Sequence, residues 1–193
     1  MTAIATKPIT AEEFFDFANL PENRGRHLEL EAGEIIEMTK PGKFHGFVCG
    51  NIARILGNFA VQRKKGYVCT NDTGVIVDRD PDTVRGPDIL FFEDAAAASD
   101  IGRKYAETPA VLAIEVLSPN DTHGKIMKRV NEQLAFGTLL VWVVDFDEEN
   151  VTVYRPGKAP IVVEADQEIG GADALPDLHC KVSEFFAMPG LEP

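Results

Sequence analysis

Two carboxylates in the middle of the sequence stand where they could do chemistry. Glu115 lies inside the apolar run 110–117, AVLAIEVL, and Asp88 comes directly before the apolar run ILFF. A lone carboxylate in a buried strand is costly unless a partner compensates for its charge. If the two strands are neighbours, Asp88 and Glu115 meet at one end of a sheet, where a divalent cation would relieve their mutual repulsion.

Such a cation would define the chemistry of the site. Oxygen ligands with open water positions suit Mg²⁺ or Mn²⁺, and an ion of this kind activates water and stabilises the charge that develops on a phosphate during hydrolysis. A structural alternative stays open, in which Glu115 bonds a backbone group or a serine and Asp88 only caps a turn. Spacing alone favours this simpler alternative.

The elements that precede these carboxylates follow from capping signals and hydrophobic periodicity. Thr10 and Glu13 form a capping box that predicts a helix over 10–20. Residues 26–38, RHLELEAGEIIEM, predict a hairpin that turns at Ala32-Gly33. Apolar residues at helical spacing predict a helix over 44–64. Three short strands are expected next, at YVCTN, GVIVD and DILFF.

Residues 110–146 predict a βαβ unit. A buried strand, AVLAIEVLS, precedes a helix over 123–137, and the near-continuous apolar strand 138–146 follows. These two strands should be parallel and joined right-handedly. A closing hairpin over 150–165 and a short helix at 182–188 would complete the chain. We therefore expect a single domain over 1–193, of α/β (α+β) class, with a mixed sheet flanked by helices.

Composition narrows the class of protein. The chain has 193 residues, of which 45% are hydrophobic and 26% charged, as in an ordinary globular domain. The net charge of −12 argues against a general nucleic-acid binder but allows a local basic site. Lysine and arginine do cluster, at RKK (63–65) and KIMKR (125–129), although both runs also fit solvated helix faces.

The sequence also predicts where the protein is found. No apolar run is long enough to span a bilayer, and the first ten residues lack the features of a signal peptide. The three cysteines, Cys49, Cys69 and Cys180, are odd in number and show no CxxC spacing. They predict reduced thiols in a cytoplasmic protein without a structural zinc site.

Four stretches, in order along the chain, share one pattern. They are the Glu-Leu-x-x-Gly-Glu of the hairpin, the Pro-x-x-x-His of PGKFH, the Pro-Asp of GPDILFF and the Ile-Glu-Val-Leu-Ser-Pro of AIEVLSPND. Together with the tail ALPDLHCKVSEFF, this set resembles the Uma2 family, a bacterial group within the PD-(D/E)XK nuclease superfamily. The resemblance implies a restriction-endonuclease-like fold and a metal-dependent endonuclease that hydrolyses phosphodiester bonds in DNA.

The resemblance also implies roles for particular residues. Asp88 and Glu115 would be the metal ligands for Mg²⁺ or Mn²⁺, with the carbonyl of Val116 as a third. Glu29 would supply an additional acidic group, the alternative being an exposed hairpin charge. His45 would lie near the site at the start of its helix, the alternative being a surface residue that makes a hydrogen bond.

The chain departs from the superfamily pattern at the position where that pattern has a lysine. The position two residues after Glu115 is Leu117, and the Uma2 family is similar in supplying a lysine from the next helix instead. That place falls on Arg129, with Lys128 beside it, and the family's preceding helix aspartate falls on Lys125. Arg129 should reach back to the sheet while Lys128 points toward solvent. An arginine can hold a phosphate but cannot act as a base.

Two functions therefore stay open. The first is a Mg²⁺-dependent endodeoxyribonuclease that acts on DNA, and such enzymes often work as homodimers. The second is a catalytically weak or inactive nuclease-fold protein that serves as a binding or assembly module, which the net charge of −12 and the departures at Arg129 and Lys125 favour.

Overall fold

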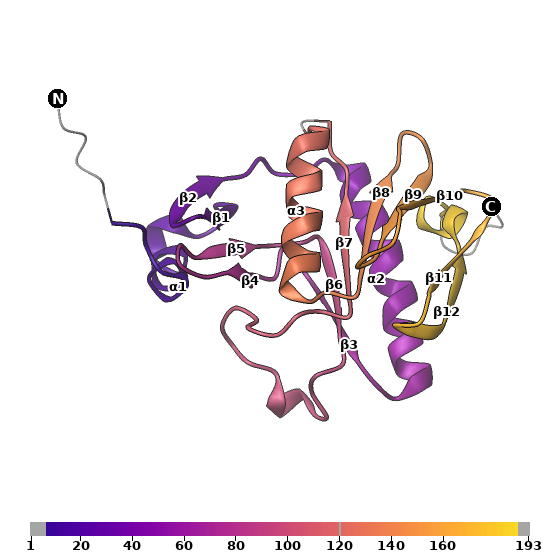
Figure 1. Cartoon of the computed structure of the whole chain (residues 1–193), viewed down its shortest axis with the longest axis horizontal. Coiled ribbons are helices and arrows are strands. Elements are labelled where there is room, and N and C mark those ends of the chain that lie inside the picture. The colour runs from indigo at the N-terminus through magenta and orange to yellow at the C-terminus, as the bar shows by residue number, and fades with distance from the viewer. Residues whose placement is uncertain (1–6, 120, 189–193) are drawn as a thin grey trace.

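A six-stranded sheet lies at the centre of the fold (Figure 1). The computed structural model describes residues 7–119 and 121–188, so the first six residues, on which part of the signal-peptide prediction rests, lie outside it. The strand order is β10-β9-β8-β7-β6-β3. The strands are β3 Tyr67–Thr70, β6 Ile89–Phe92, β7 Leu112–Val116, β8 Leu140–Asp145, β9 Asn150–Tyr154 and β10 Ile161–Glu164.

The sheet is mixed, as predicted. Strands β7 and β8 are parallel, and the other neighbouring pairs are antiparallel. Helix α3, His123–Phe136, connects β7 to β8 and confirms the βαβ unit. Thr122 caps this helix by accepting a hydrogen bond from the backbone of Lys125, and Gly137 ends it in the left-handed conformation, with φ of 117°.

The two faces of the sheet are covered by different helices. Helix α2, Lys43–Arg63, packs with Leu112, Ile114 and Val116 of β7 in one apolar cluster, and α3 packs with Ala113 in another. Side chains alternate along a strand, so Glu115 points to the face that α3 covers. The alternation of β7 thus explains why a residue of α3 meets Glu115.

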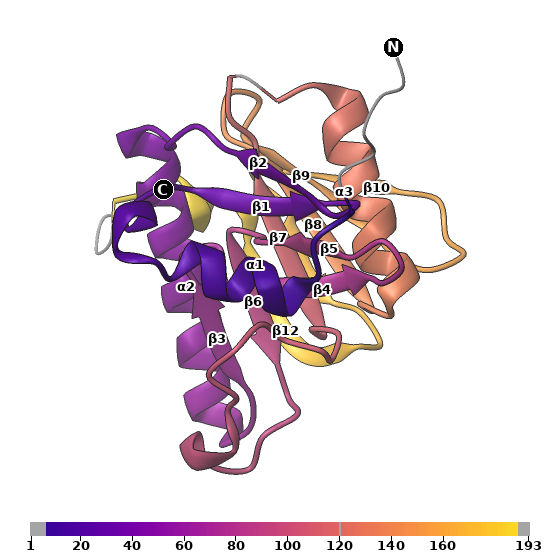
Figure 2. The ribbon, with the colours of Figure 1, turned by 90° about the vertical axis from the view of Figure 1, so that its left-hand side faces the viewer.

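A second sheet stands beside the first and carries the N-terminal hairpin. Its order is β2-β1-β5-β4, with β1 Leu28–Glu31, β2 Glu34–Glu37, β4 Val75–Asp78 and β5 Thr83–Arg85. Helix α1, Ala11–Ala18, begins with the predicted capping box and lies across this sheet (Figure 2). Phe14 of α1 packs in one cluster with Leu30, so Glu29 and Glu31 point to the opposite face of β1.

Some elements differ from the sequence predictions. Strand β5 and the two-stranded sheet of β11, Glu168–Gly171, and β12, Leu175–Lys181, were not predicted. The short terminal helix is a 3-10 turn, Val182–Phe185. Two further 3-10 turns span Pro21–Asn23 and Ala98–Asp100. None of the helices within the described residues is both long and apolar enough to cross a membrane.

Candidate active site

The two carboxylates singled out in the sequence do lie beside each other. Strands β6 and β7 pair with Ile89 opposite Ile114, which sets Asp88 opposite Glu115 at the end of the ladder. Asp88 Oδ2 accepts a hydrogen bond of 2.7 Å from the backbone N–H of Val116. The antiparallel register therefore brings a carboxylate from before one strand next to a carboxylate near the end of the other.

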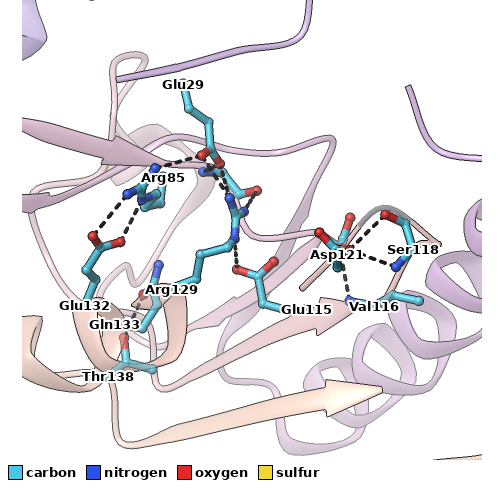
Figure 3. Close-up of polar contacts among 12 residues, drawn as sticks. Glu29, Arg85, Glu115, Val116, Ser118, Asp121, Arg129, Glu132, Gln133 and Thr138 are labelled. Carbon is cyan, nitrogen blue, oxygen red and sulfur yellow. Dashed lines mark hydrogen bonds and ion pairs between the residues drawn. The ribbon is translucent and has the colours of Figure 1, made fainter. Parts of the chain in front are cut away.

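Arg129 compensates for the buried charge of Glu115. The Arg129 side chain lies between two carboxylates, Glu115 from the central sheet and Glu29 from the hairpin (Figure 3). Its Nε donates to Glu115 Oε1 at 3.0 Å, and its Nη1 lies 2.8 Å from both oxygens of Glu29. Its Nη2 donates to the carbonyl of Gly86 at 3.1 Å. Each of the three nitrogen atoms of the guanidinium thereby donates to a protein group.

A second buried arginine extends this network. Arg85 of β5 is only 2% exposed, and its Nη1 donates to Glu29 at 3.2 Å. Its Nε and Nη2 also contact Glu132 of α3 at 2.7 and 3.0 Å, and Nη2 donates to Glu31 at 2.8 Å. Sequence reasoning missed Arg85, because it lies in a three-residue strand that has no periodic signal. Its position next to Gly86-Pro87 was the only available indication.

His45 joins helix α2 to the same end of the sheet. Its Nε2 lies 3.0 Å from the carbonyl of Val116 and 3.3 Å from Asp88 Oδ1, and since a carbonyl can only accept, Nε2 carries a proton. Burial is the largest single influence on the pKa of His45 and lowers it, but the hydrogen bonds and charges of Asp88 and Cys49 together outweigh burial and raise that pKa to about 10. A positive charge therefore stands beside Asp88 in this state of the protein.

The electrostatics of Glu115 reflect competing causes. Burial raises the pKa of the Glu115 carboxyl, the nearby charge of Asp88 adds to this, and Arg129 opposes it. Burial lowers the pKa of Arg129, but the carboxylates of Glu115 and Glu29 raise it by more than burial lowers it. The guanidinium therefore stays protonated. Glu115 and Arg129 thus form a buried ion pair in which each charge depends on the other.

Glu29, Asp88, Glu115 and Arg129 line a cleft of about 390 Å³ between the hairpin, the loop 38–42, the start of β6, the end of β7 and the start of α3. Its lining contains six carboxylates but only three lysine or arginine side chains, together with two histidines. The carboxylates are those of Glu29, Glu37, Asp72, Asp88, Glu115 and Asp121, and the basic residues are Lys40, Lys125 and Arg129. The excess of negative charge suits a cation better than an unaccompanied phosphate.

The other predicted site residues differ in burial and in whether they reach the cleft. Glu29 is 3% exposed, so the alternative of an exposed hairpin charge is wrong. His45 is 6% exposed, so it is not a surface residue either. Lys125 lines the cleft, whereas Lys128 is half exposed, pairs with Glu31 and is not among the lining residues. The structure thus brings Arg129, and not Lys128, to the carboxylates.

The helix-covered mixed sheet with paired carboxylates at one end is the architecture of a nuclease-type fold. The structure matches the "Crystal structure of a putative nuclease belonging to DUF820 from Anabaena variabilis", with a TM-score of 0.75, 25% identity, and coverage of 93% of this chain and 98% of that chain. A model of the Uma2 family, described as "Putative restriction endonuclease", matches residues 11–183. This chain belongs to the Uma2 family. No curated protein matches it. Family and fold together indicate a nuclease.

Proposed function

We propose that this protein is a divalent-metal-dependent endonuclease that hydrolyses phosphodiester bonds in DNA. Asp88, Glu115 and the carbonyl of Val116 would hold Mg²⁺ or Mn²⁺. The observation that carries the proposal is the register of β6 and β7, which sets Asp88 opposite Glu115 in a cleft that has an excess of carboxylates. Oxygen donors in this number suit a hard cation that keeps several of its waters.

The residues fit such an ion. Glu115 Oε2 accepts no hydrogen bond from the described residues, and Asp88 Oδ1 contacts only His45 among them. Each carboxylate therefore keeps an oxygen for a ligand, while its other oxygen is held by Arg129 or by the backbone of Val116. When bound, the ion would lower the pKa of a bound water and stabilise the charge on the phosphate.

The side chains of the chain itself would position these ligands. Arg129 orients Glu115 and opposes the rise in its pKa that burial causes, and Glu29 in turn fixes Arg129. Glu29 is itself held by Arg85 and by the backbone N–H of Gly86 at 2.9 Å. Arg129 and Glu29 are therefore positioning residues in this proposal. Arg129 cannot accept a proton, so no lysine-like base is supplied from this position.

One observation favours the second function, a nuclease-fold protein that binds or assembles without cleaving. The guanidinium of Arg129 neutralises Glu115 and Glu29 together, and His45 stands beside Asp88, so the carboxylates are compensated by the protein itself. In that case the cleft needs no ion, and added metal would leave the stability of the protein unchanged.

Plasmid nicking separates the two functions. Purified protein is incubated with supercoiled plasmid and Mg²⁺ or Mn²⁺, with EDTA as the metal-free control. The proposed nuclease nicks only with metal, and Asp88→Asn abolishes nicking. Asp166→Asn is a matched control, because Asp166 is exposed in the turn between β10 and β11. Nicking that persists undiminished in Asp88→Asn contradicts the proposal.

Thermal unfolding provides a second readout that does not depend on turnover. Metal should raise the melting temperature of the wild type and of Asp166→Asn, and should leave Asp88→Asn unchanged. No nicking and no metal-dependent rise would establish the non-catalytic function instead. Light scattering on the same samples tests the expected homodimer.

The basic run 63–65 is a poor candidate for holding DNA against this cleft. It lies at the far end of α2 from His45, about 27 Å away along the helix axis at 1.5 Å per residue. Arg63 and Lys65 also pair with Glu93, at 2.6 and 2.5 Å. Lys40 and Lys125 line the cleft, and they are the lysines that would contact a phosphate there.

A further inference from the structure

Cys49 belongs to a cluster that the proposed nuclease chemistry does not use. His45 and Cys49 lie one turn apart on the same face of α2, and Asp88 approaches them from the start of β6. One donor atom from each of the three lies within 4.8 Å of the others. His45 stands between its two neighbours, with Nδ1 3.5 Å from Cys49 Sγ and Nε2 3.3 Å from Asp88 Oδ1.

This cluster opens into a second cavity, which adjoins the cleft and shares Pro41, His45, Asp72 and Asp88 with it. The cavity measures about 310 Å³ and is lined by residues of α2, by the loop 70–72 and by Asp88. Cys49 lines only this cavity, Glu115 and Arg129 line only the cleft, and His45 and Asp88 line both. The space holds several waters at about 30 Å³ each, so a bound ion would keep open positions.

The donor atoms of this cluster select a different kind of metal from that of the cleft. A thiolate, an imidazole and a carboxylate are the ligands of Zn²⁺ and similar transition ions, whereas Mg²⁺ prefers oxygen. A tetrahedral ion about 2.0–2.1 Å from nitrogen and 2.3 Å from sulfur places those atoms roughly 3.5–3.6 Å apart. The distance between His45 Nδ1 and Cys49 Sγ is 3.5 Å, so this edge of the site is already formed.

The hydrogen bonding of His45 supports the same assignment. The carbonyl of Val116 accepts from Nε2, which leaves Nδ1, the nitrogen next to Cys49, as the one that can bind an ion. Ligating histidines commonly donate their other N–H to a carbonyl or carboxylate, which fixes the orientation of the ring. The ion would take the place of protons on Nδ1 and on the thiol, and the Asp88 carboxylate would turn from Nε2 toward it.

We propose that His45, Cys49 and Asp88 bind a transition-metal ion of the Zn²⁺ class. Because Asp88 is shared, such an ion would also draw this ligand away from the cleft and inhibit Mg²⁺-dependent cleavage, a consequence that rests on the proposed nuclease function. The sequence did not suggest this site, since Cys49 has no cysteine partner nearby and Asp88 lies far away along the chain.

Cobalt titration tests the binding directly. Co²⁺ is added to EDTA-treated, reduced full-length protein, and a thiolate-to-cobalt charge-transfer band reports bonding to sulfur. The wild type should show this band with one equivalent of Co²⁺, and Zn²⁺, but not Mg²⁺, should abolish it. Cys49→Ser should lose the band and weaken Co²⁺ binding at least about tenfold. The matched control Cys69→Ser, a half-buried thiol on β3, should keep both.

In the cobalt titration, the proposed site is contradicted if the wild type shows no charge-transfer band or if the band persists in Cys49→Ser.

A measurement on the wild-type protein avoids the possibility that Cys49→Ser loses the band only because it misfolds. Zn²⁺ should slow the alkylation of Cys49 by iodoacetamide, followed by mass spectrometry, and leave Cys69 unaffected. Equal alkylation of Cys49 with and without Zn²⁺ also overturns the site.

The inhibitory consequence has its own readout. Zn²⁺ should reduce Mg²⁺-dependent nicking by the wild type and by Cys69→Ser, and should have at least about tenfold less effect on Cys49→Ser. Equal inhibition of all three proteins contradicts the sharing of Asp88. If the wild type never nicks, the nuclease function fails, and the cobalt titration still decides whether the site exists.

Discussion

Replacing Arg129 by methionine tests the account of how Glu115 is tolerated in an apolar strand. Among the described residues, Arg129 alone makes a hydrogen bond or ion pair with the Glu115 side chain, and Glu115 is 5% exposed. Removing one partner from a buried pair costs about 3–5 kcal/mol. For a protein of this size, 1 kcal/mol shifts the melting temperature by about 2–4 °C, so Arg129→Met should lower it by roughly 6–20 °C.

The neighbouring residue provides the control. Lys128 also forms an ion pair, with Glu31, but both side chains are more than a third exposed. Such pairs contribute about 0–1 kcal/mol, so Lys128→Met should lower the melting temperature by less than about 4 °C. Both variants are melted in EDTA, followed by circular dichroism. Equal melting temperatures for Lys128→Met and Arg129→Met would refute the reasoning.

The pH dependence of the Arg129→Met defect provides a further check. Burial raises the pKa of Glu115, and the charge and hydrogen bond that oppose this rise both come from Arg129. When a carboxyl group has a higher pKa in the folded protein than in the unfolded chain, the free energy of unfolding falls as the pH rises from the unfolded-state pKa to the folded-state pKa. The deficit of Arg129→Met relative to wild type should therefore be smaller at about pH 5 than at about pH 8. Adding Glu115→Gln, which removes the charge, should recover more than half of the loss at the higher pH.

Three other predictions concern local structure. Thr10→Ala removes the N-terminal cap of α1 that Glu13 completes, and should cost about 1 kcal/mol in denaturant unfolding; an unchanged midpoint would contradict the capping role. Gly137→Ala should destabilise by more than about 1 kcal/mol, because φ is 117° and the added Cβ would lie 3.3 Å from a proline side chain; a more stable variant would show that the turn relaxes. Burial raises the pKa of the Cys180 thiol to about 12, so Cys180 should react with a thiol reagent only after Cys69, and the reverse order would mean that β12 opens readily.

Much of the fold could be predicted because its elements have strong local signals. The capping box of α1, the hairpin turn at Ala32-Gly33 and the apolar run of β7 each specify their own conformation. Strand β5 carries no such signal, since it is only three residues long and is flanked closely by Pro81 and Gly86. The small sheet of β11 and β12 was missed because Gly170-Gly171 and Pro176 interrupt any alternation.

The sequence also predicted part of the candidate site, namely its two central carboxylates and the arginine that reaches them. Family resemblance pointed to Asp88 and Glu115, and helix geometry correctly favoured Arg129 over Lys128 as the residue that reaches the sheet. The partners of Glu29 were not predictable, because the contact with Arg85 depends on how two sheets pack together. The pairing of Cys49 with Asp88 likewise arises only when α2 packs across the start of β6.

The position of Glu29 has a consequence for folding. Glu29 belongs to the second sheet, where Leu30 of its own strand packs with α1 in a cluster apart from the two larger ones, while Val75 and Val77 of β4 pack with the central sheet. Its ion pair with Arg129 therefore joins the hairpin to helix α3. We expect the hairpin of β1 and β2 to detach in a partial unfolding event that leaves the central sheet intact. In native-state hydrogen exchange, the amides of β1 and β2 should open at lower free energy than those of β7. If Glu115 binds the proposed metal, that ion would be retained during such an opening of the cleft wall, and substrate entry would then be separable from metal binding.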